Sequence, residues 1–133
     1  MSVVSPHPLV LLACEPSETE VLRALVPAGA SVVTAESTER AVERIRQGVD
    51  AVVCTLDFDD SRMLELVREA HAQRPDLPVL CCRVFGTSIS DITLRGAATA
   101  AFSLGVAAFL DLASPALGSD VMEFVSALVR LLG

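Results

Sequence analysis

Short apolar runs alternate with longer amphipathic stretches five times along the chain. Runs such as Val10-Leu11-Leu12 do not alternate between apolar and polar residues, which is typical of strands covered on both faces. The pattern therefore predicts buried strands separated by helices. The five predicted strands are Leu9–Ala13, Ser31–Thr34, Ala51–Leu56, Pro78–Val84 and Ala107–Leu110.

The stretches between these runs have a helical period and are bounded by capping residues and glycines. Ser17-Glu18-Thr19-Glu20 has the pattern of a capping box and opens the first helix, which is expected to end at Gly29. The remaining helices are predicted from Ser37 or Thr38 to Gly48, from about Asp60 to Gln73, from about Ser90 to Gly105, and from Ser119 or Asp120 to Leu132.

Five strand–helix units in this order predict parallel strands joined by right-handed crossovers. A chain of 133 residues is long enough for one hydrophobic core, and we expect residues 1–133 to form a single domain. The fold class is α/β, a flavodoxin-like (βα)5 three-layer sandwich with sheet order 2-1-3-4-5. In such a sheet a functional site is expected at the carboxyl ends of strands one and three, where the strand order reverses.

Charge and hydropathy exclude two classes of partner. The chain has 10 basic and 17 acidic residues, a net charge of -7, and no local cluster of Lys or Arg. Because such a surface repels phosphate backbones, nucleic acid is not a predicted partner. The apolar stretch from Ala97 to Leu112 contains Thr99, Ser103 and Asp111 and is too short to span a bilayer. We expect a soluble, cytoplasmic protein with no membrane partner.

Cysteine and histidine positions do not indicate a metal site. The cysteines lack CxxC spacing and no histidine lies near them in sequence. Neighbouring residues of a strand point to opposite faces, so the pair Cys81-Cys82 favours core packing over a redox cluster. The residues concerned are Cys14, Cys54, Cys81 and Cys82, together with two isolated histidines expected in solvent, His7 and His71.

One segment resembles a known family. Asp50-Ala51-Val52-Val53-Cys54-Thr55, followed by Leu64-Glu65-Leu66-Val67-Arg68 at the family's spacing, is similar to the third strand and next helix of bacterial response-regulator receiver domains (CheY-like). The resemblance covers nearly the whole chain and implies the same fold and a place in two-component signalling. In that family the residue at Thr55's place is the phosphoacceptor aspartate. Thr55 has no carboxylate and cannot form an acyl phosphate.

The resemblance also implies that the rest of the phosphorylation pocket is degenerate. Ala13 and Cys14 stand where the family has its magnesium-binding acidic pair, and only Glu15 matches the usual continuation. Arg83 stands where a Thr or Ser contacts the phosphoryl group, and Leu112 stands in place of the lysine. Magnesium needs hard oxygen ligands that these residues do not supply. We therefore expect no metal, no cofactor and no enzyme activity, but a pseudo-receiver that acts independently of phosphorylation through protein–protein interaction.

Asp57 is the alternative acceptor. It lies two residues past Thr55, on the same strand face if the strand continues, and Asp59 and Asp60 follow it. A displaced acidic site would make the protein an atypical phosphoacceptor response regulator. The preferred interpretation is an acidic loop that caps the third helix, because Asp is favoured at helix starts.

Arg83 interrupts an apolar run, Val79–Cys82, at the end of the fourth strand. A guanidinium in that place is costly unless it is paired, and Glu15 or Asp57 is expected to supply the carboxylate. The hypothesis is an internal lock in which Arg83 replaces the charges of the metal and the lysine. Two alternatives remain open: Arg83 reaches solvent along its aliphatic stem, or it holds an anion and makes the domain a small-ligand sensor.

The fourth helix is unusually apolar, and the segment from Arg83 to Gly105 is longer than the family usually carries. In receiver domains the face made by helix four, strand five and helix five is the common partner and dimer surface. Phe102 lies on this helix, and Phe109 matches the aromatic position that moves on activation. We expect a signalling protein partner, or a homodimer, at this face, because exposed apolar patches usually mark contact surfaces.

Overall fold

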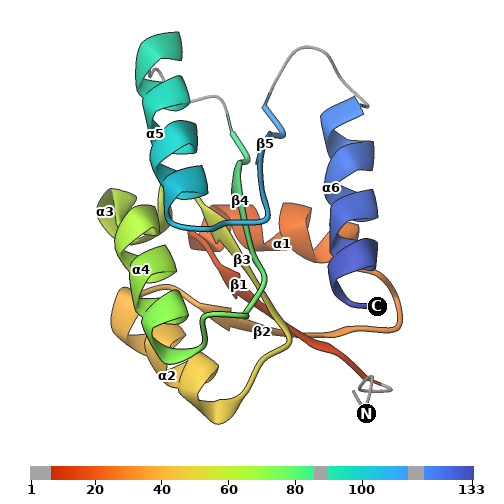
Figure 1. The fold of residues 1–133 in the computed structure, drawn as a ribbon. Coiled ribbons are helices and arrows are strands. Elements are labelled where there is room, and N and C mark those ends of the chain that lie inside the picture. The colour runs from red at the N-terminus through yellow and green to blue at the C-terminus, as the bar shows by residue number, and fades with distance from the viewer. Residues whose placement is uncertain (1–6, 86–89, 114–118) are drawn as a thin grey trace.

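The computed structural model describes residues 7–85, 90–113 and 119–133 (Figure 1). Five parallel strands form one sheet in the order β2-β1-β3-β4-β5, which confirms the predicted flavodoxin-like order. The first predicted strand has the observed bounds, and the others differ from prediction by one residue at an end or at both ends. The strands are β1 (Leu9–Ala13), β2 (Ser31–Ala35), β3 (Ala51–Thr55), β4 (Val79–Arg83) and β5 (Ala108–Asp111).

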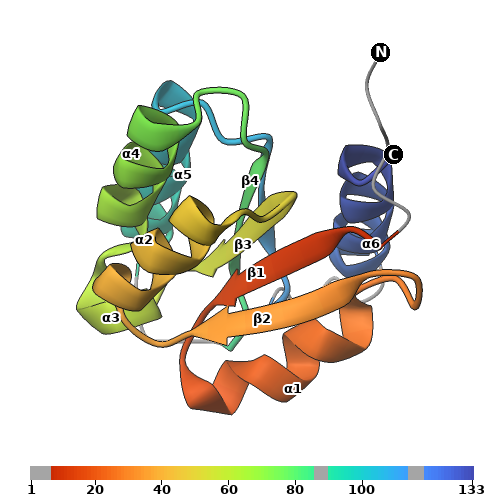
Figure 2. The ribbon, with the colours of Figure 1, turned by 90° about the horizontal axis from the view of Figure 1, so that it is seen from below.

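Helices cover both faces of the sheet (Figure 2). Helices α2 (Thr38–Gln47), α4 (Met63–Gln73) and α5 (Asp91–Ser103) lie on one face, and α1 (Pro16–Leu25) and α6 (Ser119–Leu131) on the other. Each face has its own buried cluster, and strand residues alternate between them: Leu11 packs toward the first set of helices and Leu12 toward the second. This explains the continuous apolar runs, because both faces of each central strand are covered. No helix of the described residues is long and apolar enough to cross a membrane.

The four cysteines are free thiols buried in this core. Cys54 and Cys81 belong to the cluster under α2, α4 and α5, whereas Cys14 and Cys82 belong to the cluster under α1 and α6. Burial raises the pKa of Cys54 and Cys82 well above the ordinary thiol value, and that of Cys81 to about 12. The prediction of core packing, with Cys81 and Cys82 on opposite faces, is confirmed.

Helix α1 differs from its predicted bounds at both ends. Its N-cap is Glu15 and its first residue is Pro16, so the predicted capping box at Ser17 is wrong. The Glu15 backbone N–H donates to Glu18 Oε1 at 2.9 Å, and this places Glu18, rather than Glu20, in the capping position. The helix ends at Leu25 because Val26 precedes Pro27 and adopts an extended conformation, as residues before proline do.

The predicted third helix is two elements. A short turn, α3 (Phe58–Ser61), precedes α4, and three of its residues, Asp59, Asp60 and Ser61, have left-handed φ values of 48°, 55° and 65°. Asp59 Oδ2 accepts hydrogen bonds from the backbone N–H and the hydroxyl of Thr38, both at 2.8 Å. The acidic loop therefore caps the first turn of α2, which corrects the expectation that it caps the helix that follows it.

His71, expected in solvent, joins three segments. Its Nδ1 lies 2.8 Å from the carbonyl oxygen of Leu104, at the end of α5, and its Nε2 lies 3.0 Å from the carbonyl oxygen of Leu77, which precedes β4. A β-carbon on Gly105 would lie within 3.5 Å of the imidazole ring, and Gly105 has a φ of 93°. The glycine therefore permits the turn that brings α5 against His71.

Candidate functional site

The candidate site lies at the carboxyl ends of β1 and β3, where the strand order reverses. Ala13 ends β1 beside Cys54, and Thr55 ends β3 beside Cys82. The side chains of Ala13, Cys14 and Thr55 are all buried. The structure thus brings together the site residues predicted at the ends of strands one and three, in a place closed to solvent.

Glu18 fills this place. The Thr55 hydroxyl donates a hydrogen bond of 2.7 Å to Glu18 Oε1, and the same oxygen accepts the Glu15 backbone N–H. Glu18 is 2% exposed and Thr55 0%. A buried carboxylate is costly unless its oxygens are hydrogen-bonded, so the hydroxyl and the N–H together allow Glu18 to occupy the interior. The helix α1 is thereby tied to the end of β3.

Acidic groups gather around the rim of the site. Partial burial raises the pKa of Glu15, and the charges of Glu18, Asp60, Asp57 and Asp59 raise it further. The pKa of Asp59 is lowered, because its carboxylate accepts hydrogen bonds from the backbone N–H and the hydroxyl of Thr38. The rim is therefore negatively charged. Of its carboxylates, that of Asp59 is hydrogen-bonded to Thr38.

The donor set does not fit the magnesium ion that receiver domains hold at this edge. Magnesium requires an octahedron of hard oxygen ligands. Ala13 supplies no oxygen, Cys14 presents a buried sulfur, and the Thr55 hydroxyl is engaged by Glu18. Among the described residues, no three His, Cys, Asp or Glu side chains are grouped so that they could hold a metal ion.

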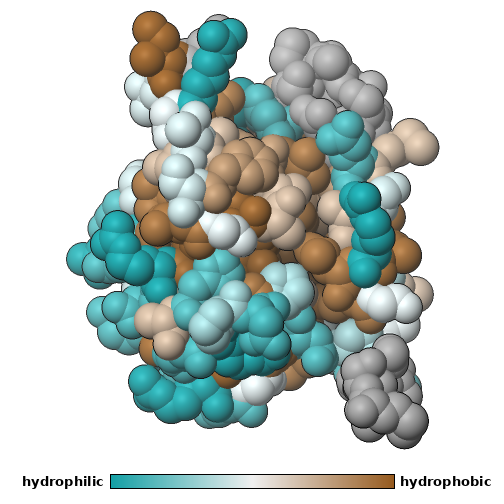
Figure 3. All heavy atoms as spheres, in the orientation of Figure 1, coloured by the Kyte–Doolittle hydropathy of each residue, from teal (hydrophilic) through white to brown (hydrophobic). Residues whose placement is uncertain are grey.

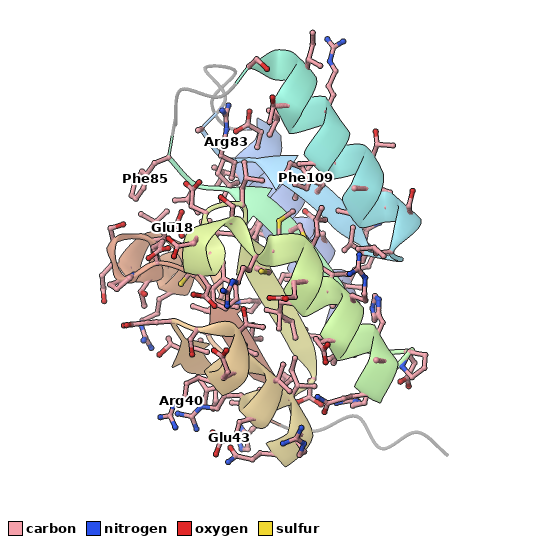
Figure 4. The ribbon with its side chains drawn as sticks, turned by 90° about the vertical axis from the view of Figure 1, so that its left-hand side faces the viewer. Glu18, Arg40, Glu43, Arg83, Phe85 and Phe109 are labelled. Carbon is pink, nitrogen blue, oxygen red and sulfur yellow. The ribbon has the colours of Figure 1, made fainter. Side chains whose placement is uncertain are left out.

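Arg83 is held by the neighbouring strand. Its Nε and Nη2 donate to Asp111 Oδ1 and Oδ2 at 2.9 and 2.7 Å, a two-point ion pair between the ends of β4 and β5. Asp111 Oδ1 also accepts the backbone N–H of Ala113. Asp111 thus supplies the carboxylate to Arg83, which corrects the expectation that Glu15 or Asp57 supplies it. Glu18, bound to the end of β3, and Arg83, at the end of β4, both lie at the edge of the sheet at which the strands end (Figure 4).

The remaining predicted residues lie on both faces of the sheet. Leu112 is partly buried against the cluster under α1 and α6, and its backbone N–H donates to the Arg83 carbonyl. Phe109 lies beside Cys81 in the sheet and packs against the opposite cluster, whereas Phe102 on α5 is 53% exposed. Asp57 is partly buried and lines a cavity between the α3–α4 segment and α5.

Sequence reasoning missed Glu18 and Asp111. Glu18 was assigned to the interior of a capping box, although its spacing of three from Glu15 is also that of a capping pair. Arg83 and Asp111 lie at the ends of β4 and β5, which are neighbours in the predicted order 2-1-3-4-5. The strand order could therefore have predicted this pair. Side chains at the ends of adjacent parallel strands are neighbours.

Comparisons with known proteins identify the fold. No family model matches the sequence, and no curated protein matches it. Solved structures do match in fold. A LuxR-family two-component response regulator from an Aurantimonas species has a TM-score of 0.73 at 23% identity, covering 96% of this chain and 86% of that chain.

Two further neighbours agree. The signal receiver domain of an HD domain-containing protein from Pseudomonas fluorescens has a TM-score of 0.74 at 20% identity, covering 99% of this chain and 91% of that one. The receiver domain of a sensor histidine kinase from Pseudomonas aeruginosa, with magnesium coordinated in its active-site cleft, has a TM-score of 0.68 at 21% identity, covering 96% and 98%. The chain has the fold of the response-regulator receiver domains.

Proposed function

We propose that this protein is a receiver-like signalling module of bacterial two-component systems that acts in the cytoplasm through protein–protein interaction and without phosphorylation. The observation that carries the proposal is the 2.7 Å hydrogen bond from Thr55 to the buried Glu18 carboxylate. Thr55 stands where the family has its acceptor carboxylate, and a neutral hydroxyl cannot take that role. Glu18 also brings a negative charge to the place that an incoming phosphoryl group would have to enter.

The pocket is more consistent with a fixed scaffold than with a switch. The Arg83–Asp111 pair joins the ends of β4 and β5, and Phe109 packs into the core beside Cys81. Both features hold the edge of the sheet in one arrangement without a metal or a phosphoryl group. Anion sensing by Arg83 is less favoured, because an anion would have to displace a carboxylate that binds the guanidinium at two points.

The Asp57 alternative has weaker support. Asp57 is the nearest carboxylate that follows β3, but Leu112 and Ala13 replace the lysine and an acidic ligand on which phosphoryl transfer in the family relies. Catalysis of phosphoryl transfer rests on positioning and on positive charge around the phosphoryl oxygens. The residues around Glu15 instead supply negative charge, from the carboxylates of Glu18, Asp57, Asp59 and Asp60. We propose no enzyme activity for the chain.

The partner surface that we propose is the face of α5, β5 and α6. Figure 3 shows hydrophobic residues gathered on this face between the two helices. Phe102, Met122 and Val129 are 53%, 71% and 51% exposed. A groove of about 450 Å³ runs between β5 and α6 and is lined in part by Ala108, Leu110 and Met122. Phe102 is the better candidate contact, because Phe109 is engaged in the core.

Two measurements test the proposal. Incubation with acetyl phosphate and magnesium, followed by intact-mass spectrometry, is expected to give no phosphoryl adduct. An adduct that is absent from an Asp57→Asn variant would instead support the acceptor alternative. Light scattering across a concentration series tests the homodimer: the wild type is expected to dimerise and a Phe102→Ser variant to remain monomeric. Thr99→Ser, another exposed change on α5, is the matched control.

A further inference from the structure

A small cavity lies between the α3–α4 segment and α5, beside the degenerate pocket. Its volume is about 220 Å³. Apolar side chains make up most of its lining, and polar groups come from Asp57, Ser61 and Thr93. The apolar lining residues are Leu56, Met63, Leu64 and Ala97. Figure 4 views the side of the molecule on which α4 and α5 lie.

The cavity exists because α5 presents small side chains to α4. Thr93 and Ala97, one turn apart, line it from α5, and Leu64 and Met63 line it from α4. A cavity of about 150 Å³ lined by apolar side chains holds one benzene molecule. The present cavity is therefore of a size for one bulky apolar side chain.

The charge around the cavity selects its partner. Asp57 lines it directly, and Asp57, Asp59 and Asp60 all lie close enough to Glu15 for their charges to act on its carboxyl. The nearby Arg62 is shared between Asp59 and Glu65 at 3.6 and 3.9 Å, and Arg83 is paired with Asp111. An apolar pocket with a surplus of carboxylates complements an apolar anchor flanked by positive charge.

We propose that this cavity is the anchor site for one bulky apolar side chain carried on a basic segment of a partner protein. The inference deepens the proposed function, on which it rests, by naming a second contact surface and the chemistry that it recognises. The apolar side chain displaces water from the cavity and supplies most of the affinity. The flanking Lys or Arg residues face Asp57 and its neighbours and set the orientation and the association rate.

Short capped peptides and amide NMR titrations of the full chain test this inference. Arg-Phe-Arg is expected to give saturable shifts centred on Leu56, Leu64 and Ala97. Arg-Ala-Arg, which lacks the anchor, and Glu-Phe-Glu, which reverses the charge, are each expected to bind at least about tenfold more weakly, a difference of about 1.4 kcal/mol. Equal binding by either control peptide would overturn the proposal. Equal saturation by benzylammonium would also overturn it, because the cavity would then be a site for a small organic cation.

Variants locate the binding in the cavity. Ala97→Leu fills the cavity from α5 and is expected to abolish the Arg-Phe-Arg shifts while the fold is retained, because filling a cavity with apolar atoms commonly stabilises a protein. Thr99→Leu adds a larger apolar side chain to the same helix at an exposed position outside the cavity and is expected to bind normally. Thr93→Leu is the second filling variant if Ala97→Leu does not fold. Unchanged binding by a folded filling variant would overturn the inference.

The titrations separate this inference from the proposed function. Failure of the peptides to bind would remove the anchor site but leave the hydrogen bond between Thr55 and Glu18 untouched. Phosphorylation by acetyl phosphate, measured without peptide, would contradict the proposed function while the cavity could still bind Arg-Phe-Arg. Each result therefore bears on one proposal only.

Discussion

The Thr55 hydroxyl donates a 2.7 Å hydrogen bond to the Glu18 carboxylate inside the protein. The two residues are separated by 37 positions in sequence and join α1 to the end of β3. Both are buried, so the hydrogen bond forms away from water and involves an acceptor that is costly to leave unsatisfied. In the function that we propose, this pair occupies the place of the acceptor aspartate of receiver domains.

Removal of the Thr55 hydroxyl is expected to destabilise the fold. Thr55→Val keeps the shape of the side chain and leaves the buried Glu18 carboxylate without one of its donors. The free energy of unfolding, measured by urea denaturation, should fall by about 1.5–3 kcal/mol. Thr55→Ser, which keeps a donor, is the matched control and should lose less. In a Glu18→Leu background, Thr55→Val should cost little. A Thr55→Val protein as stable as the wild type would contradict the role of the pair.

Restoration of an aspartate at position 55 is expected to harm the protein rather than to restore a switch. Thr55→Asp places a second carboxylate against Glu18, and two like charges in a buried site raise the pKa of the pair. A pKa raised by folding contributes stability at low pH that is lost as the pH rises through it. The stability of Thr55→Asp relative to the wild type should therefore fall from pH 5 to pH 8, and Glu18→Gln should reverse this fall. Wild-type stability for Thr55→Asp at pH 8 would contradict the prediction.

The Arg83–Asp111 pair is expected to contribute to stability and to order the end of β5. Its side chains are 13% and 22% exposed, so it lies between surface pairs and buried pairs. A double-mutant cycle with Arg83→Gln and Asp111→Asn should give a coupling of about 1–3 kcal/mol. The amide signals of Leu112 and Ala113 should shift in both variants. An Arg83→Ala variant with unchanged melting temperature and unchanged loop shifts would refute the internal lock.

Asp59 is expected to make stability depend on acid. Hydrogen bonds from Thr38 lower its pKa, so its contribution is present above the ordinary Asp value of about 3.9 and is lost as the pH falls through the lowered value. Asp59→Asn still accepts hydrogen bonds and tolerates the left-handed backbone, but it does not titrate. The wild type should therefore lose more stability than Asp59→Asn between pH 5 and pH 2. An equal loss of stability in the two proteins between pH 5 and pH 2 would contradict this role of the Asp59 carboxylate.

The fold was predictable because apolar runs indicate buried strands and capping residues mark the ends of helices. Leu9–Ala13 was placed to the residue because every member is apolar, and Ser37 and Gly48 bound α2 as their chemistry predicts. The left-handed turn Asp59–Ser61 was not predictable, because its stability depends on the hydrogen bonds to Thr38, which is 21 residues away. The loop expected before Ser90 falls on residues 86–89, outside the described part of the chain.

The loss of the phosphorylation site stays a prediction from the resemblance, which places Ala13, Cys14, Thr55 and Leu112 where the family has its acidic pair, its acceptor and its lysine. The groups that take their place, Glu18 and Asp111, come from a helix interior and from the neighbouring strand. Their roles depend on three-dimensional distance, because each is hydrogen-bonded to a residue at least 28 positions away.

An amide NMR titration of the wild-type protein with magnesium and beryllofluoride, a phosphoryl mimic that needs a carboxylate acceptor, tests the central claim most directly. Occupation of the pocket by the Thr55–Glu18 pair predicts no saturable shifts around Thr55, Asp57 and Arg83, and none at Phe109. Saturable shifts at these residues that spread to Phe109 would show that a displaced acceptor survives, and the phosphorylation-independent account would then be wrong.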